Sequence, residues 1–115
     1  MQHKDRVRLL HMFEAARTVE RYTSGKTMER FYEDEILRFA LTTLFQNIGE
    51  AARKISEEFK AEHPEFEWVD IVGFRHRLVH GYDVIDYDIM WDIIQNDLPV
   101  LLGHLEALNL IELPL

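Results

Sequence analysis

Apolar residues recur every three or four positions along most of this 115-residue sequence, which is the spacing of one face of an α-helix. The strict alternation that marks a half-buried β-strand is absent. The pattern predicts helices at about 5–22, 27–60, 68–80 and from about 86 onward, the second either continuous or broken near Gly49. We therefore expect an all-α fold, an antiparallel bundle of four to five helices.

Residues that favour helix ends lie between these segments. Gly25 and Gly81 follow the first and third helices, where glycine can adopt the left-handed conformation that ends a helix. Asp86 or Asp88 is a suitable N-cap for the fourth helix. Pro99 is expected to interrupt or kink that helix, because proline lacks the amide proton that a helix interior requires.

Length and composition indicate a single domain covering residues 1–115, with 47% hydrophobic residues and no cysteine. The absence of cysteine excludes disulfides and thiolate metal sites. No apolar run approaches the roughly 20 residues of a membrane span, and the first ten residues are too charged for a signal peptide. We expect a cytoplasmic protein with no membrane partner. The net charge of −8 argues against broad nucleic-acid binding, so such a role would need a local basic site.

The best candidate for a local basic site is the segment GFRHRLVHGYDVIDYD at positions 73–88. It gathers Arg75, His76, Arg77 and His80 within six residues, and Tyr82 follows shortly after. On a helix of about 100° per residue, the two histidines lie one turn apart at the edge of the apolar stripe. Arg77 lies on the solvent side. Tyr82 is either ordinary packing or a group beside the basic pair.

Arg75 falls in the middle of the apolar stripe on the same helical wheel, among Trp68, Val72 and Val79. A guanidinium stays protonated, and removing it from water without a partner costs several kcal/mol. We therefore expect Arg75 to meet a negative charge. A carboxylate from another helix, or a subunit interface, is the simplest answer. A phosphate is the alternative, since arginine binds phosphate in a bidentate manner and the nearby His80 can transfer protons near neutral pH.

The i, i+4 spacing of His76 and His80 also suits a metal ion. Arg75 and Arg77 flank the pair, however, and would repel a divalent cation, so we expect no metal. The third ligand of such a site would come from one of three aspartates, Asp83, Asp86 or Asp88.

Three segments together carry a resemblance to a known family. Arg75, four residues, His80, Gly81 and Tyr82 resemble the Rx4HxY signature of the HepT-like toxins, within the HEPN superfamily of helical nucleotide-binding and ribonuclease domains. The following run IMWDIIQNDLPVLL and the earlier segment QNIGEAA at positions 46–52 are similar to the same family. One position differs, because His76 stands where members usually carry asparagine. The resemblance covers nearly the whole chain and implies a HEPN-like helical fold.

The resemblance also implies a function. HepT-like proteins are dimers whose motif helices face each other across a cleft, and they cleave RNA without a metal or other cofactor. By carry-over, Arg75 would hold the scissile phosphate and His80 would act as general acid and base, with His76 in support. The partner would be an MntA-like nucleotidyltransferase, the antitoxin of a type II toxin–antitoxin system, which would transfer AMP to Tyr82.

Two other functions remain open at this point. The chain could be a non-catalytic HEPN module that binds a nucleotide or pairs with a nucleotidyltransferase. It could instead be a purely structural dimer in which Arg75 forms an ion pair. The ribonuclease would cleave RNA in the presence of a chelator, whereas the binding module would not. For the structural dimer, replacing His80 with alanine would change nothing.

Overall fold

The structure is a computed structural model that describes residues 1–81 and 84–110, with the main chain alone at His80. Its helices and strands, in chain order, are α1 (His3–Thr23), α2 (Met28–Glu33), α3 (Glu35–Arg53), α4 (Glu57–Glu62), α5 (Trp68–Val72), α6 (Phe74–Leu78), β1 (Val79–His80), β2 (Val84–Ile85), α7 (Tyr87–Asp92), the π-helix η1 (Ile93–Asp97) and α8 (Leu98–Ala107). The predicted all-α bundle is therefore confirmed.

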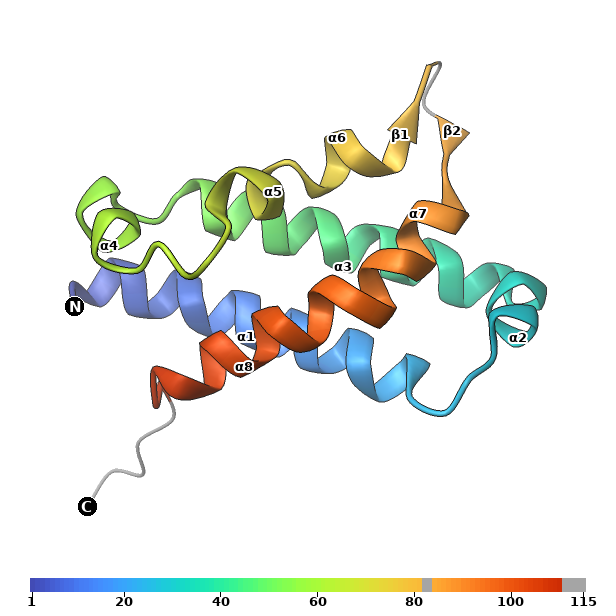
Figure 1. Ribbon diagram of the computed structural model, residues 1–115, viewed down its shortest axis with the longest axis horizontal. Helices are drawn as coiled ribbons and strands as arrows, with labels where there is room; N and C mark the ends of the chain where they lie inside the picture. Colours follow the sequence, from blue (N-terminus) through green and yellow to red (C-terminus); the bar gives the residue numbers. More distant parts are fainter. Residues whose placement is uncertain (82–83, 111–115) are drawn as a thin grey trace.

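The long helices α1 and α3 run side by side in opposite directions (Figure 1). The short helices α5 and α6 follow one another along the other side of α3, and both contact it. The chain then returns through α7, η1 and α8 as one nearly continuous rod, and α8 packs across α1. Helix α3 therefore lies between α1 and the segment that carries the basic motif.

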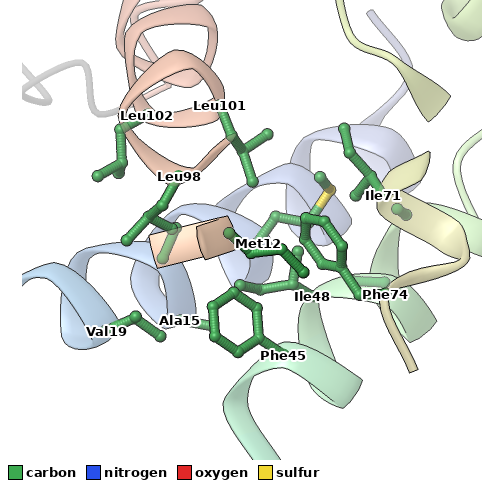
Figure 2. Packing of buried hydrophobic residues seen from close by; sticks show 14 of the residues in the cluster. Met12, Ala15, Val19, Phe45, Ile48, Ile71, Phe74, Leu98, Leu101 and Leu102 are labelled. Atoms are coloured by element: carbon green, nitrogen blue, oxygen red, sulfur yellow. The ribbon is translucent and has the colours of Figure 1, made fainter. Parts of the chain in front are cut away.

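The apolar core joins all of these helices (Figure 2). The long helices α1 and α3 contribute buried side chains that recur every three or four positions. The labelled residues are Met12, Ala15 and Val19 from α1, Phe45 and Ile48 from α3, Ile71 and Phe74 from α5 and α6, and Leu98, Leu101 and Leu102 from α8. Phe45 and Phe74 meet edge to face with ring centroids 5.5 Å apart, which fixes α6 on α3.

The predicted helix at 27–60 is three helices, and its breaks do not fall at Gly49. The first break is at Asp34, whose side chain caps α3 by accepting a hydrogen bond from the Leu37 amide at 3.0 Å. The second break precedes Ser56, which caps α4 in the same way. The amide of Ser56 donates to buried Asp5 in α1 at 2.8 Å, so this break is also tied to the bundle.

A short β-ribbon replaces the expected end of the third helix. Strands β1 and β2 are antiparallel, with Val79 opposite Ile85 and His80 opposite Val84. Gly81 lies in the turn with φ +55°, a left-handed value that glycine adopts at little cost. Helix α6 therefore ends at Leu78, and His80 lies in extended backbone rather than at a helix end.

The last helical segment starts and is interrupted near the two residues that the sequence predicts, Asp86 and Pro99. Asp86 caps α7 by accepting a hydrogen bond from the Ile89 amide at 3.0 Å, which confirms one of the two expected start points. Pro99 is the second residue of α8, directly after the π-helical turn η1. A wider turn at this point fits proline, which cannot donate the usual backbone hydrogen bond.

Within residues 1–81 and 84–110, no helix has both the length and the apolar character needed to cross a bilayer.

Candidate functional site

Arg75 is exposed, and its predicted place in the middle of an apolar stripe is wrong. The helical wheel treated residues 68–80 as one straight helix, whereas the chain breaks at Gly73 and leaves the helix after Leu78. Phe74 and Leu78 take the inward positions, at 2% and 1% exposure. The buried line of α6 therefore runs one residue away from Arg75. The burial of Arg75 therefore does not require an external anion.

Arg75 and His76 lie in the wall of a groove between α6 and α3. The groove is also lined by Val72 at the end of α5, by Val79 of β1 and by Gly81 in the ribbon turn. The opposite wall is made by five residues of α3: Gln46, Asn47, Gly49, Glu50 and Arg53. Two cationic side chains and a titratable imidazole thus share one open groove.

Gly49 explains how α5 comes so close to α3. A Cβ atom at this position would lie 3.2 Å from the carbonyl oxygens of both Ile71 and Val72, which is tighter than most real contacts. Glycine therefore lets the backbone at the end of α5 rest directly on α3. The turn at Gly73 follows directly, so this contact also determines how close Arg75 lies to the residues of α3.

The α3 wall carries an ion pair. The Arg53 guanidinium lies 2.5 Å from Oε1 of Glu50, one helical turn away. The hydrogen bond from Arg53 and its charge lower the pKa of Glu50, and the same contact raises the pKa of Arg53. Both groups are therefore charged at neutral pH. With Arg75 added, the groove carries two positive charges against one carboxylate among its described residues, in a protein of net charge −8.

Arg77 lies away from the groove and has a structural partner. Its Nη1 donates to Oδ2 of Asp97 at 2.8 Å, and its guanidinium carbon lies 5.8 Å from the centre of the Phe74 ring. Both partners of the ion pair are about one-third exposed. The wheel placed Arg77 on the solvent side, but it joins α6 to the π-helical turn η1 instead.

The aspartates weighed as metal ligands have other partners where the structure describes them. Asp86 caps α7, and Asp88 accepts a hydrogen bond from the hydroxyl of Tyr32 in α2. Desolvation and this hydrogen bond raise the pKa of Tyr32 to about 12. Asp83 lies outside the described residues. Across residues 1–81 and 84–110, no group of three histidine or acidic side chains is placed to hold a metal ion.

The other two motif residues are placed only in part. The main chain of His80 lies in β1, and its neighbours Val79 and Gly81 both line the groove. The assignment of His80 as general acid and base stays a prediction. Tyr82 lies outside the described residues, and its assignment as the site of AMP transfer also stays a prediction.

The sequence indicated the wall of the groove that carries Arg75 and His76, but it did not indicate that α3 forms the opposite wall. The segment at 46–52 was recognised only for its family resemblance, and Arg53 was not singled out. A signal was present, because Gln46, Asn47, Glu50 and Arg53 recur at helical spacing on the polar side of α3. That signal does not say which other helix this side faces.

A helical bundle with an Rx4HxY segment beside a positively charged groove defines a HEPN-type protein. The model of the Ribonuclease HepT-like family matches residues 12–108, and the chain belongs to this family. The resemblance noted from the motifs, the expected fold and the expected enzyme class, a ribonuclease, are thereby confirmed.

Several curated proteins are similar over most of their length. A protein of Thermococcus cleftensis named "Probable ribonuclease HepT" is 34% identical over 107 residues, which cover 93% of this chain and 96% of that protein. A protein of Methanocaldococcus jannaschii named "Putative RNase MJ1380" is 32% identical over 85% of this chain and 90% of its own length. No solved structure matches the chain significantly.

Proposed function

We propose that this chain is a metal-independent endoribonuclease, folded as a single domain over residues 1–115, that uses the groove between α3 and α6. One observation carries the proposal: Arg75 and His76 share that groove with Arg53, so that an acidic protein offers a local positive site. The ribonuclease names of the relatives support RNA as the substrate. The guanidinium of Arg75 is exposed in the groove wall, where a phosphate can reach it.

In the proposed reaction, Arg75 binds the scissile phosphate and offsets the charge that develops on its oxygens. His80 accepts the proton of the adjacent ribose 2′-hydroxyl as that oxygen attacks phosphorus. The bond from phosphorus to the 5′-oxygen breaks, and His80, now protonated, returns that proton to the 5′-oxygen as it leaves. The products are a 2′,3′-cyclic phosphate and a 5′-hydroxyl. His76, beside Arg75, supports the phosphate contact.

The proposal includes a homodimer, in which two grooves face a common cleft. Two copies would double a small positive site on a protein whose overall charge repels RNA. It also includes a cytoplasmic role as the toxin of a type II toxin–antitoxin system. The antitoxin, an MntA-like nucleotidyltransferase, would transfer AMP to Tyr82. The added phosphate would place bulk and negative charge close to the groove residue Gly81, and so exclude RNA.

Cleavage of RNA in the presence of EDTA tests this proposal. The wild type is expected to cut, and Arg75→Ala and His80→Ala are each expected to lose at least about 100-fold in rate. Arg17→Ala is the matched control, because Arg17 is an exposed arginine of α1 that pairs with Glu106. Retained cleavage in both motif variants would refute the assignment of the site.

One observation favours a second candidate function. His76 stands in the position where the family usually has asparagine, and it lies in the groove wall beside Arg75. A non-catalytic module that binds a nucleotide or pairs with a nucleotidyltransferase would tolerate this change. Such a module would show no cleavage by the wild type, and cells expressing it would grow as well as cells expressing His80→Ala.

A further inference from the structure

A second groove adjoins the proposed active site. It lies between α1 and α3, and its lining includes Arg8 and His11 of α1 and Lys54 at the end of α3. Asn47 and Glu50 line both this groove and the one that holds Arg75. Since α3 lies between α1 and α6 (Figure 1), the two grooves form one path that starts at α6, crosses α3 and ends at α1.

The cations of the second groove are not neutralised by ion pairs. Across residues 1–81 and 84–110, neither Arg8 nor Lys54 forms a salt bridge, whereas Arg17, Arg53 and Arg77 each do. Glu50, the carboxylate that lies one helical turn before Lys54 on the wall shared by both grooves, is already paired with Arg53. Arg8 and Lys54 therefore remain able to bind an anion from outside the chain.

The charge of this path differs from that of the other hollows. Counting the described lining residues, four side chains with a permanent positive charge face two carboxylates along the path, and two histidines can add charge. The hollow between α5 and α8 is lined by four carboxylates and one histidine. The hollow around Lys26 and Arg30 has three carboxylates. Neither of these two hollows, nor the apolar hollow around Leu41, carries the excess of positive charge that this path has.

We propose that the groove between α1 and α3 is a binding subsite for the backbone of single-stranded RNA next to the cleaved bond. Arg8 and Lys54 bind phosphates of nucleotides that flank the scissile one, and Asn47 lies where the strand crosses α3. Asn47 has no hydrogen-bond partner among the described residues, and its amide can bind a base edge or a ribose hydroxyl without adding charge. The inference rests on the proposed ribonuclease function, and it adds where the strand lies beyond the reacting phosphate.

RNA binding by the catalytically blocked His80→Ala chain tests the subsite without cleavage. The probe is a fluorescent single-stranded oligonucleotide, compared with a trinucleotide, and the readout is fluorescence anisotropy over a range of salt concentrations. Adding Arg8→Gln and Lys54→Gln is expected to weaken binding of the longer RNA about tenfold. The slope of log K against log salt should fall by about 1.4, at about 0.7 for each phosphate contact to a single strand. The loss is expected to be greater for the longer RNA than for the trinucleotide.

The matched control is Lys26→Gln with Arg30→Gln, which removes the same charge at the other hollow and is expected to leave binding and its salt slope unchanged. Circular dichroism confirms that each variant is folded. Equal losses in both double variants would overturn the subsite in favour of a general charge effect. So would normal binding by the Arg8 and Lys54 variant. If the wild type neither binds nor cleaves RNA, the proposed function itself fails, which is a different result from either of these.

Discussion

At the scale of single residues, the side chains that fix the ends of helices are as informative as those in the core. Tyr32 is an example, because its hydroxyl donates to Asp88 and so ties α2 to the first turn of α7. Arg38 of α3 reaches the same junction, since its guanidinium carbon lies 5.0 Å from the centre of the Tyr87 ring. These contacts hold the start of α7, and the ribbon strand β2 leads directly into it.

The Tyr32 contact predicts a pH dependence of stability. The unfolded chain loses the phenolic proton near pH 10, whereas desolvation and Asp88 raise the pKa of Tyr32 to about 12 in the folded chain. The stabilisation is therefore complete below pH 10 and is lost as the pH rises through 12. Urea unfolding gives the free energy of unfolding of the wild type and of Tyr32→Phe at pH 8 and at several values between pH 10 and 12. The difference between the two proteins should become smaller as the pH rises. The same comparison with Tyr22→Phe, at an exposed tyrosine that does not contact Asp88, should show no such convergence.

At the scale of helices and strands, the sequence predicts where helices form better than where they break. The three-to-four-residue spacing identifies the long elements because each buries one continuous face. The break before Ser56 is tied to Asp5 of α1, and the turn at Gly73 follows the contact of α5 with Gly49 of α3. Both breaks therefore involve distant parts of the chain, which a local pattern does not contain. The missed break at Gly73 produced the wrong burial for Arg75. The wheel put His76 at the edge of the stripe and Arg75 in its middle, whereas both line one groove, and the α3 wall of that groove arises only from packing.

Gly49 supplies a test of that packing. Gly49→Ala should push the end of α5 away from α3, since a Cβ would lie 3.2 Å from two backbone carbonyls. Backbone cannot yield as a flexible side chain does, so we expect destabilisation of about 1–3 kcal/mol and weaker RNA cleavage. Thermal or urea unfolding measures the first effect, and the chelator-resistant nuclease assay measures the second.

The control for Gly49→Ala is Gly103→Ala in α8, where nothing lies within 4 Å of the added Cβ. Alanine is the better helix former, so this variant is expected to gain up to about 1 kcal/mol of stability. If both variants behave alike, the close approach of α5 to α3 does not position the groove.

At the scale of the whole molecule, charge and apolar surface are unevenly distributed. The chain is acidic overall, yet the exposed side of α3 bears Ile36, Phe39, Ala40 and Thr43 without a charge. Ile36 is 82% exposed and Phe39 is 60% exposed, and Tyr22 of α1 lies in the same apolar hollow as Ile36. Two copies of an acidic protein repel each other least across an uncharged surface, and a symmetric pair brings each surface against itself. We therefore expect the proposed homodimer to form there.

Replacing Ile36 and Phe39 with glutamate should convert the dimer to a monomer, because like charges would face each other in a desolvated contact. Sedimentation analysis gives the mass, and circular dichroism shows whether the helices persist. Val69→Glu is the control, since Val69 is 86% exposed on a different helix. A wild type that sediments as a monomer would remove the dimer from the proposal, and an unchanged dimer in the glutamate variant would place the contact elsewhere.

The chain changes from helix to extended strand between Leu78 and Val79, so the motif residues Arg75 and His80 lie in different secondary structures. Arg75 belongs to a helix anchored in the core by Phe74 and Leu78, and His80 belongs to a two-residue strand at the edge of the molecule. The position of Arg75 is therefore fixed by the interior of the bundle, whereas that of His80 depends on the pairing of β1 with β2.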